Sequence, residues 1–307
     1  MSDVIVLGSL NMDLVVRVGH IPRPGETVLG RDFVTVPGGK GANQAAAAAR
    51  LGVPVEMVGR VGTDAFGEAM LANLRGQGVG TSYIRRDPAA PSGIALITVD
   101  ERGENAIVVA PGANGRVSRE DVEGARELLK RARFLVMQFE IPLPTVQAAI
   151  HWASQWGVRV ILNPAPAQAV SPDFLQGVYC LVANETEAEI LTGFAIRSLE
   201  AAAQAGQALR RLGVPVAIIT LGAEGAMLST EEGDLHVPAR KVEVVDTTAA
   251  GDAFIGGLVA ALCKEMPWPE AVRYATCAGT LATMVLGAQT SLPDAARLEA
   301  FFQEGCP

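Results

Sequence analysis

Residues 134–162 read FLVMQFEIPLPTVQAAIHWASQWGVRVIL, and this stretch decides the fold. Its two short apolar runs, Phe134–Phe139 and Val158–Leu162, are typical of buried strands, and Pro144–Trp156 between them has the pattern of a helix. A strand, a helix and a second strand in this order form the unit that joins parallel strands. The stretch therefore predicts a parallel sheet with helices packed on it.

The same alternation extends in both directions along the chain. We expect further strands at Asp3–Leu7, Val55–Val61, Val178–Val182 and Ala217–Leu221, the last opening a β-rich stretch that runs to His236. We expect further helices at Gly41–Leu51, Ala65–Arg75, Glu185–Thr192, Leu199–Leu212, Ala250–Cys263, Trp268–Leu286 and Asp294–Gln303. The sequence thus predicts a single α/β domain over residues 1–307, whose mostly parallel central sheet has helices on both faces.

Four predicted strands interrupt this alternation because no helix separates them. They lie at Leu14–Val18, Thr27–Val36, Gly93–Val99 and Asn105–Val109. They are too short to form a second core, so we expect a small sheet, formed by residues 13–36 and 93–109, that acts as a lid over the carboxyl ends of the parallel strands. An exposed sheet face needs a cover, so we expect a homodimer through the lids.

Composition excludes several classes of function. The chain is 49% hydrophobic, which is ample for a core, and its net charge of −8 disfavours nucleic acid or an anionic membrane as a partner. Three histidines and four cysteines without C-x-x-C spacing argue against a transition-metal site. The start MSDVIVLGSLNMD lacks the basic residues and long apolar core of a signal peptide, and no apolar run reaches the length of a membrane span. We therefore expect a soluble cytoplasmic protein.

A turn of small residues precedes one of the last predicted helices. Residues 246–254 read DTTAAGDAF, in which Ala249, Ala250 and Gly251 allow a sharp entry into a helix whose first N–H groups are unpaired. These donors can bind a phosphoryl group, and a carboxylate beside it, Asp252, has a purpose if it accepts a hydroxyl proton. Taken alone, the pattern also fits an ordinary helix N-cap.

A second glycine-rich segment, PGGKGANQ, covers residues 37–44. Its glycines allow close approach of the backbone to a polar ligand, and Lys40 and Asn43 supply donors. The spacing is not that of a Walker A motif, and no G-x-G-x-x-G follows a strand, which disfavours a nicotinamide-dependent enzyme. A flexible entry to a helix is the simpler alternative.

Further polar residues follow predicted strands. Asn184 and Glu187 stand three apart at a helix start, where they could hold Mg²⁺ through water and touch nucleotide phosphates, or simply cap the helix. Asn11, Asp13 and Glu140 come just after two other strands, and carboxyl ends of parallel strands converge. Such side chains can bind adjacent hydroxyls of a sugar.

Together these segments resemble the ribokinase-like family of carbohydrate kinases. GSLNMD, PGGKGANQAAAAAR, MQFE, LNPAPA, NETEAE, ITLGAEG and DTTAAGDAF occur in the family's order over nearly the whole chain. Each motif is moderately specific, and seven in order are highly specific. The resemblance implies a ribokinase-like fold with a β lid and ATP-dependent phosphorylation of D-ribose at its 5-hydroxyl to D-ribose 5-phosphate, with Mg²⁺ required and K⁺ as activator.

The resemblance also implies roles for individual residues. Asp252 matches the catalytic base, and Ala249, Ala250 and Gly251 match the anion hole. The ribose site that it implies consists of Asn11, Asp13, Gly38, Gly39, Lys40, Asn43, Glu140 and Asp252. The ATP site consists of Asn184, Thr220, Leu221, Gly222, Ala223, Glu224, Gly225, Gly251 and Thr276. Glu187 matches a glutamate linked indirectly to Mg²⁺, and the K⁺ loop consists of Asp246, the Thr248 carbonyl, Ala282, Val285, Gly287 and Ser291.

One departure and two alternatives bear on this interpretation. Thr276 stands where the family often carries a larger polar side chain beside adenine, which puts selectivity for the base in question. Another kinase of the family, acting on a nucleoside, fructose or a keto-deoxy sugar acid, is the first alternative, although the first lid pair offers only Phe33 as an aromatic side chain. A catalytically inactive sugar-binding protein is the second, although Asp252 and Gly251 are intact.

Overall fold

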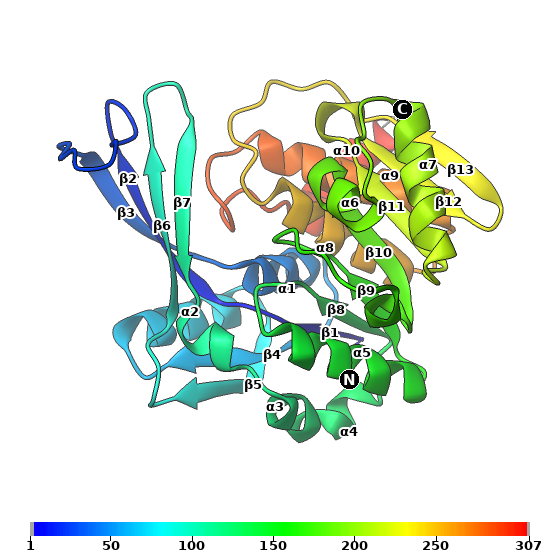
Figure 1. Cartoon of the computed structure of the whole chain (residues 1–307), viewed down its shortest axis with the longest axis horizontal. Helices are drawn as coiled ribbons and strands as arrows, with labels where there is room; N and C mark the ends of the chain where they lie inside the picture. The colour runs from blue at the N-terminus through cyan, green and yellow to red at the C-terminus, as the bar shows by residue number, and fades with distance from the viewer. Residues whose placement is uncertain (1–2, 306–307) are drawn as a thin grey trace.

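The computed structural model describes residues 3–305, which form a nine-stranded sheet, a four-stranded sheet and the helices around them (Figure 1). The strands from β11 to β5 are parallel, and β12 and β13 add an antiparallel edge. Across the nine-stranded sheet the order is β13 (Gly233–Val237), β12 (Ala226–Thr230), β11 (Val216–Thr220), β10 (Val178–Asn184), β9 (Arg159–Leu162), β8 (Phe134–Met137), β1 (Val4–Leu7), β4 (Val55–Gly62) and β5 (Gly80–Asp87).

Helices cover both faces of this sheet. Alternate residues of β1 point to opposite faces, so Val4 and Val6 enter one hydrophobic core while Ile5 and Leu7 enter the other. The first core is closed by α1 (Lys40–Arg50), α2 (Ala65–Gly76), α8 (Ala250–Cys263), α9 (Trp268–Thr283) and α10 (Ala295–Gln303). The second is closed by α3 (Arg119–Gly124), α4 (Arg126–Leu129), α5 (Leu143–Gln155), α6 (Glu185–Thr192) and α7 (Leu199–Arg211).

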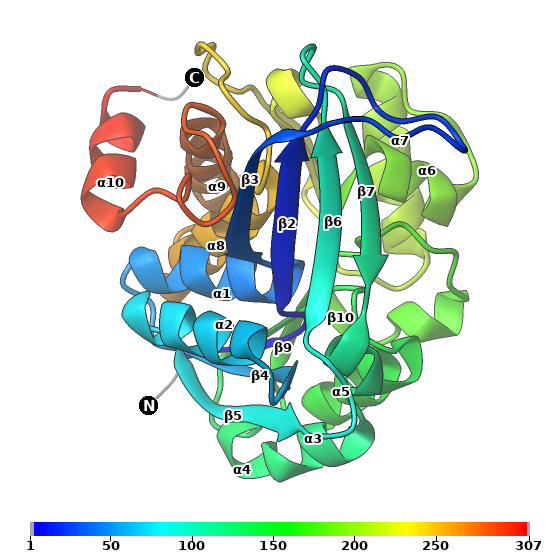
Figure 2. The ribbon, with the colours of Figure 1, turned by 90° about the vertical axis from the view of Figure 1, so that its left-hand side faces the viewer.

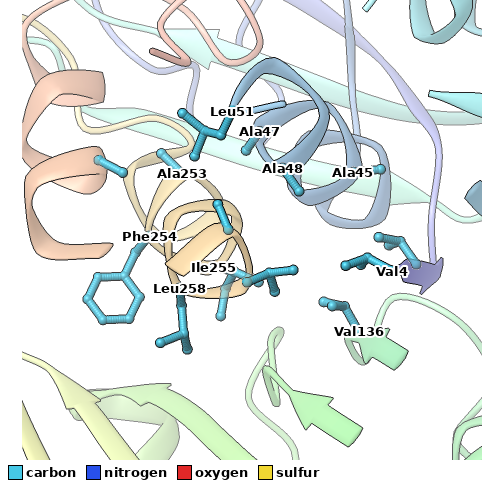
Figure 3. Close-up of a cluster of buried hydrophobic side chains, with 14 of the residues drawn as sticks. Val4, Ala45, Ala47, Ala48, Leu51, Val136, Ala253, Phe254, Ile255 and Leu258 are labelled. Atoms are coloured by element: carbon cyan, nitrogen blue, oxygen red, sulfur yellow. The ribbon is translucent and has the colours of Figure 1, made fainter. Parts of the chain in front are cut away.

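Small residues bring α1 and α8 into close contact, as Figure 3 shows. Ala47 and Ala48 on α1 are buried, and both lie next to Gly256 of α8. A Cβ atom on Gly256 of α8 would lie only 2.4 Å from the Cβ atom of Ala47, so only glycine permits this approach. The first turns of both helices therefore meet at one place, which proves to be the site.

The four-stranded sheet rises from the end of β1, of which β2 is the continuation (Figure 1). Figure 2 shows its strands side by side, with α1 and α2 at their base. The pairs β2–β3 and β6–β7 are antiparallel, and β2–β6 is parallel. Its order is β3 (Arg31–Gly38), β2 (Asn11–Arg17), β6 (Gly93–Val99) and β7 (Asn105–Ala110).

The structure confirms the predicted α/β fold, with a mostly parallel sheet between helices and a separate small sheet. It differs in detail. The strand predicted to begin at Thr27 begins at Arg31, because residues 27–30 pair with no neighbour and Leu29 is 94% exposed. The sequence did not predict β5, α3 and α4, because β5 and α3 bury few apolar side chains and α4 is only 4 residues long. Among the described residues, no helix is long and apolar enough to cross a membrane.

Candidate active site

Polar side chains line one edge of the nine-stranded sheet, where five neighbouring parallel strands end. In each case the residue is the last of its strand or follows it within three positions. Both α1 and α8 also begin at this edge. The first N–H groups of α1 donate to Glu140 and Ser9, whereas the first N–H groups of α8 include two, at Gly251 and Asp252, without a partner within the helix. These residues are Ser9 after β1, Gln138 and Glu140 after β8, Asn163 after β9, Asn184 at the end of β10 and Thr220 at the end of β11.

Asp252 lies in the first turn of α8 and is buried. Two amides from α1 hold its carboxylate: the Nδ2 of Asn43 donates to Oδ2 at 3.0 Å, and the Nε2 of Gln44 donates to Oδ1 at 3.0 Å. Burial raises the pKa of Asp252, although the positive charge of Lys40 opposes this. The result is an oriented carboxylate with a raised affinity for a proton.

The turn before α8 has an unusual backbone. Ala249 is the N-cap with φ of 58°, a left-handed conformation that is uncommon outside glycine and that concentrates at functional sites. The first helical bond runs from Ala253 N–H to the Ala249 carbonyl, so the N–H groups of Gly251 and Asp252 have no partner within the helix. Gly251 is exposed, and a Cβ atom on it would meet nothing within 4 Å. Space for an anion is therefore present at this helix start.

A cluster of charges lies between α1 and the small sheet. The Oε2 of Glu140 accepts from the Ser9 hydroxyl at 2.5 Å and from Lys40 N–H at 3.1 Å. Burial would lower the pKa of Lys40, but the charges of Asp252, Glu140 and Glu187 raise it, so Lys40 stays protonated. Burial, Glu140 and Asp252 raise the pKa of Asp13 to about 7.

Glycines let the chain close tightly around this cluster. A Cβ atom on Gly38 would lie 2.3 Å from the Asp13 carboxylate, and one on Gly39 would lie 2.6 Å from the backbone nitrogen of Asn11. Gly39 also has φ of 89°, which disfavours other residues. Asn11 is buried, and its Oδ1 accepts from the Nδ2 of Asn114 at 2.8 Å. The structure thus brings the predicted sugar-binding residues of β2, β3 and α1 together.

Asn184 and Glu187 form a reciprocal capping box at the start of α6. Glu187 N–H donates to Asn184 Oδ1 at 2.8 Å, and Asn184 N–H donates to Glu187 Oε2 at 2.9 Å. The capping alternative is therefore confirmed. Burial raises the pKa of Glu187. The pair also lines a cavity, so the cap does not remove it from the site.

This cavity has a volume of about 210 Å³ and connects the starts of α1, α6 and α8. Seven of the predicted site residues line it: Lys40, Asn184, Glu187, Thr220, Ala249, Gly251 and Asp252. Residues that the sequence analysis did not assign also line it: Asn163, Ala165, Val182, Ala183, Thr247 and Ile255. Asn163 and Ala165 belong to the LNPAPA motif, and Thr247 belongs to DTTAAGDAF. The motifs therefore pointed to these positions, although the sequence analysis assigned no role to them.

The predicted nucleotide segment, residues 220–225, follows the last parallel strand. Gly222–Glu224 form an exposed 3₁₀ turn, and Leu221 is buried. Gly225 has φ of 94°, and a Cβ atom on it would lie 2.1 Å from the Val237 carbonyl oxygen. Thr276 is buried in α9, where its hydroxyl donates to the Val272 carbonyl at 2.8 Å, and it does not line the cavity. A role beside adenine therefore stays a prediction.

The two segments of the predicted K⁺ loop lie side by side. The Asp246 carboxylate accepts from Thr248 N–H at 2.9 Å and from Gly287 N–H at 2.8 Å. Burial opposes ionisation of Asp246, but these hydrogen bonds lower its pKa. Ala282 and Ser291 are buried, and Val285 and Gly287 are half-buried. These hydrogen bonds join the segment before α8 to the 282–291 loop, and a role of the two segments in holding K⁺ stays a prediction.

Comparisons with known proteins extend over these same segments. A family model described as pfkB family carbohydrate kinase matches residues 1–295. A ribokinase from Haemophilus influenzae is 40% identical over 288 residues, 94% of each chain. A deoxyribokinase from Salmonella typhi is 38% identical over 293 residues, 95% of each chain. The solved structure of Arabidopsis thaliana ribokinase complexed with ribose and ATP matches with a TM-score of 0.91 at 32% identity, covering 99% of each chain.

Proposed function

The chain belongs to the pfkB family of carbohydrate kinases, and we propose that it transfers a phosphoryl group from ATP to the 5-hydroxyl of D-ribose, giving D-ribose 5-phosphate. The observation that carries this proposal is the buried, oriented carboxylate of Asp252 beside the open helix start at Gly251. Two relatives named ribokinase, each 40% identical over nearly the whole chain, support ribose as the sugar.

In the proposed reaction, Asp252 accepts the proton of the 5-hydroxyl as that oxygen attacks phosphorus. The two amides that bind the carboxylate leave lone pairs on each oxygen for this proton. Of the predicted anion hole at Ala249–Gly251, the Gly251 N–H binds the charge of the transferred phosphoryl group together with the Asp252 N–H, because the Ala250 N–H donates to the Thr247 carbonyl at 3.2 Å. Such donors contribute about 10²–10³ in rate. The bond from phosphorus to the β-phosphate oxygen breaks as the new one forms, and ADP leaves with that electron pair.

The sugar is proposed to bind between α1 and the small sheet. Asn11, Asp13 and Glu140 present an amide and two carboxylates to its hydroxyls, with Gly38, Gly39, Lys40 and Asn43 around them. A Cβ atom on Gly38 or Gly39 would collide with the Asp13 carboxylate or the Asn11 backbone, so a larger residue at either position would displace these sugar-binding groups. Buried polar groups that lose a hydroxyl partner are costly, which gives the site its discrimination.

The nucleotide is proposed to bind along Asn184, residues 220–225 and Gly251, with Thr276 near the base. Mg²⁺ typically keeps several waters and uses one or two carboxylates with substrate phosphates, and Glu187 offers such a carboxylate through water. When bound, the ion neutralises charge on the phosphates. The oxygen donors around Asp246 and the 282–291 loop suit K⁺, which would stiffen the segment leading to the anion hole.

The small sheet is proposed to close over the sugar as a lid and to pair with a second copy of the chain. Leu14 faces Leu96 and Leu96 faces Val108 across the strands, so these residues share the face opposite Asp13. Leu96 and Val108 are 48% and 64% exposed. A second lid would cover this apolar face and make a homodimer. Because the reaction consumes ATP, we place it in the cytoplasm.

One experiment tests the proposal: ATP turnover with Mg²⁺, with and without K⁺, on D-ribose, 2-deoxy-D-ribose, fructose, adenosine and 2-keto-3-deoxygluconate. We expect ribose-dependent ADP release that K⁺ stimulates. Preference for 2-deoxy-D-ribose is the second candidate, favoured by the 38% identity to the deoxyribokinase. Turnover of another substrate alone would reject ribose while retaining Asp252 as the base, and no turnover of any would reject the kinase proposal.

A further inference from the structure

Three side-chain amides, of the buried Gln44 and Gln138 and the half-buried Asn163, form a hydrogen-bonded network next to Asp252. The Nε2 of Gln44 donates to Asp252 Oδ1 at 3.0 Å and to Asn163 Oδ1 at 3.2 Å. The Oε1 of Gln44 accepts from Gln138 Nε2 at 2.6 Å. Gln44 thus uses both of its N–H groups and its carbonyl, and both Gln44 and Gln138 are buried. None of these three amides was assigned a role above.

A backbone carbonyl determines which end of each amide in this network donates and which accepts. The Nδ2 of Asn163 donates to the Val182 carbonyl at 3.0 Å, and a carbonyl can only accept. Asn163 must therefore turn its Oδ1 toward Gln44, and only the NH₂ end of Gln44 can meet that oxygen. The same NH₂ end then donates to Asp252. A flipped Gln44 would set its carbonyl oxygen against the carboxylate and against Asn163.

Gln138 supports this arrangement at a cost. Its Oε1 has no hydrogen-bond partner among residues 3–305, and an unsatisfied buried carbonyl costs free energy. An unsatisfied buried polar atom in a folded protein calls for an explanation. Here the orientation that leaves Gln138 Oε1 without a partner is the one that lets its Nε2 donate to Gln44 Oε1. Gly8 makes room for it, because a Cβ atom there would lie 2.1 Å from Gln138 Oε1. Gly8 and Gln138, which lie in two of the sequence motifs, thus both contribute to the hydrogen bond that holds the Gln44 amide.

We propose that Gln44, held by Gln138 and Asn163, is a positioning residue that keeps the Asp252 carboxylate in one rotation, with its remaining lone pairs toward the cavity. The inference rests on the proposed function, in which Asp252 is the base. An amide suits this task because it orients the carboxylate without a charge that would weaken it as a base. The charged groups that face Asp252 are Lys40, Glu140, Asp13 and Glu187, and none of them makes the contact that Gln44 makes.

The test compares Gln44→Met and Gln138→Met with wild type on the sugar that wild type turns over best. Displacing a reacting group costs about 100-fold in rate. We therefore expect Gln44→Met to lower kcat by about 100-fold, with the KM for ATP unchanged and the acidic limb of the kcat/KM profile moved to higher pH. The limb moves up because loss of a donor to the charged form raises the pKa of Asp252. Gln138→Met should show the same changes, smaller in size.

Controls separate this role from a structural one. Thr145→Val removes one buried hydrogen bond, to the Val117 carbonyl at 2.9 Å, and should leave kcat and the pH profile unchanged. A wild-type kcat and acidic limb in both Gln44→Met and Gln138→Met would overturn the inference and leave the proposed function standing. If Gln44→Met does not fold, Gln138→Met decides alone.

A measurement without turnover keeps the two questions apart. Titration of the ¹³C carboxyl resonance of Asp252, identified with Asp252→Asn, should show a higher pKa in Gln44→Met than in wild type. An unchanged pKa would overturn the inference whether or not the protein phosphorylates a sugar. Absence of turnover in wild type would instead reject the proposed function.

Discussion

At the scale of single residues, the chemistry of the site comes from burial more than from residue type. Asp252, Asp13 and Glu187 are ordinary carboxyl groups whose pKa values are raised because the fold removes them from water. The sequence motifs identified all three positions. Their electrostatic coupling follows only from the distances that the folded chain sets between β2, α6 and α8.

Asp252→Asn should abolish most turnover while leaving sugar binding in place. A general base contributes about 10²–10⁴ in rate, so kcat should fall by that factor. Steady-state kinetics measures the loss, and calorimetric titration with the sugar measures binding. Normal turnover in the variant would show that another group takes the proton.

Asp13→Asn should change the pH dependence of stability in the ligand-free protein. The pKa of Asp13 rises from 3.8 unfolded to about 7 folded, so its contribution is fully present below pH 4 and is lost as pH rises to 7. At about 1.4 kcal/mol per pKa unit, the loss over this rise is on the order of 4 kcal/mol. The free energy of unfolding of the variant, relative to that of wild type, should therefore increase between pH 4 and pH 7 and stay at the higher value above pH 7.

Thermal unfolding at a series of pH values measures this difference. Melting curves of wild type and Asp13→Asn that move in parallel across pH 4–7 would mean that Asp13 is not buried against Glu140 and Asp252 in solution. Repeating the series with bound sugar separates the effect of a ligand from that of the apo fold.

At the scale of elements, the contact between α1 and α8 builds the site. It brings Asn43 and Gln44 from one helix to Asp252 on the other, and the distance depends on the small side chains in between. The sequence predicted both helices within a residue or two. The sequence did not predict that the two helices are in contact, because glycine and alanine are common in helices and only the folded structure places Gly256 next to Ala47.

Gly256→Ala should destabilise the protein although alanine is the better helix former. Its Cβ atom would lie 2.4 Å from the Cβ atom of Ala47, and overpacking of this kind costs about 1–3 kcal/mol. The helices must separate, so kcat should fall as well. Gly76→Ala is the matched control, because nothing lies within 4 Å of a Cβ atom there.

Chemical denaturation measures both variants. Gly76→Ala should be neutral or more stable by up to about 1 kcal/mol. Equal stability of Gly256→Ala and Gly76→Ala would show that the contact between α1 and α8 is looser in solution than described here.

At the scale of the whole molecule, the small sheet is one part of the surface where exposed apolar side chains gather. Its outer face exposes Phe33, Leu96 and Val108, and a stable homodimer would bury them. The proposed lid and the proposed dimer therefore use opposite faces of the same four strands.

Val108→Glu should convert a dimer to a monomer by placing a charge in the covered face. Sedimentation velocity at micromolar concentration should show a dimer for wild type and a monomer for the variant. Leu235→Glu, at an exposed position on β13, is the control and should leave the dimer intact. A monomeric wild type would reject pairing through the lids.

The sequence by itself determined the fold class and the identity of most candidate site residues. Hydrophobic periodicity specifies strands and helices locally, and short motifs specify polar residues at their ends. Only the tertiary structure decided the strand order, the edge strand β5 and the amide network of Gln44, Gln138 and Asn163. The reason is physical: β5 is held by pairing with β4, and the amides by partners 94 and 119 residues apart, so no local pattern records them.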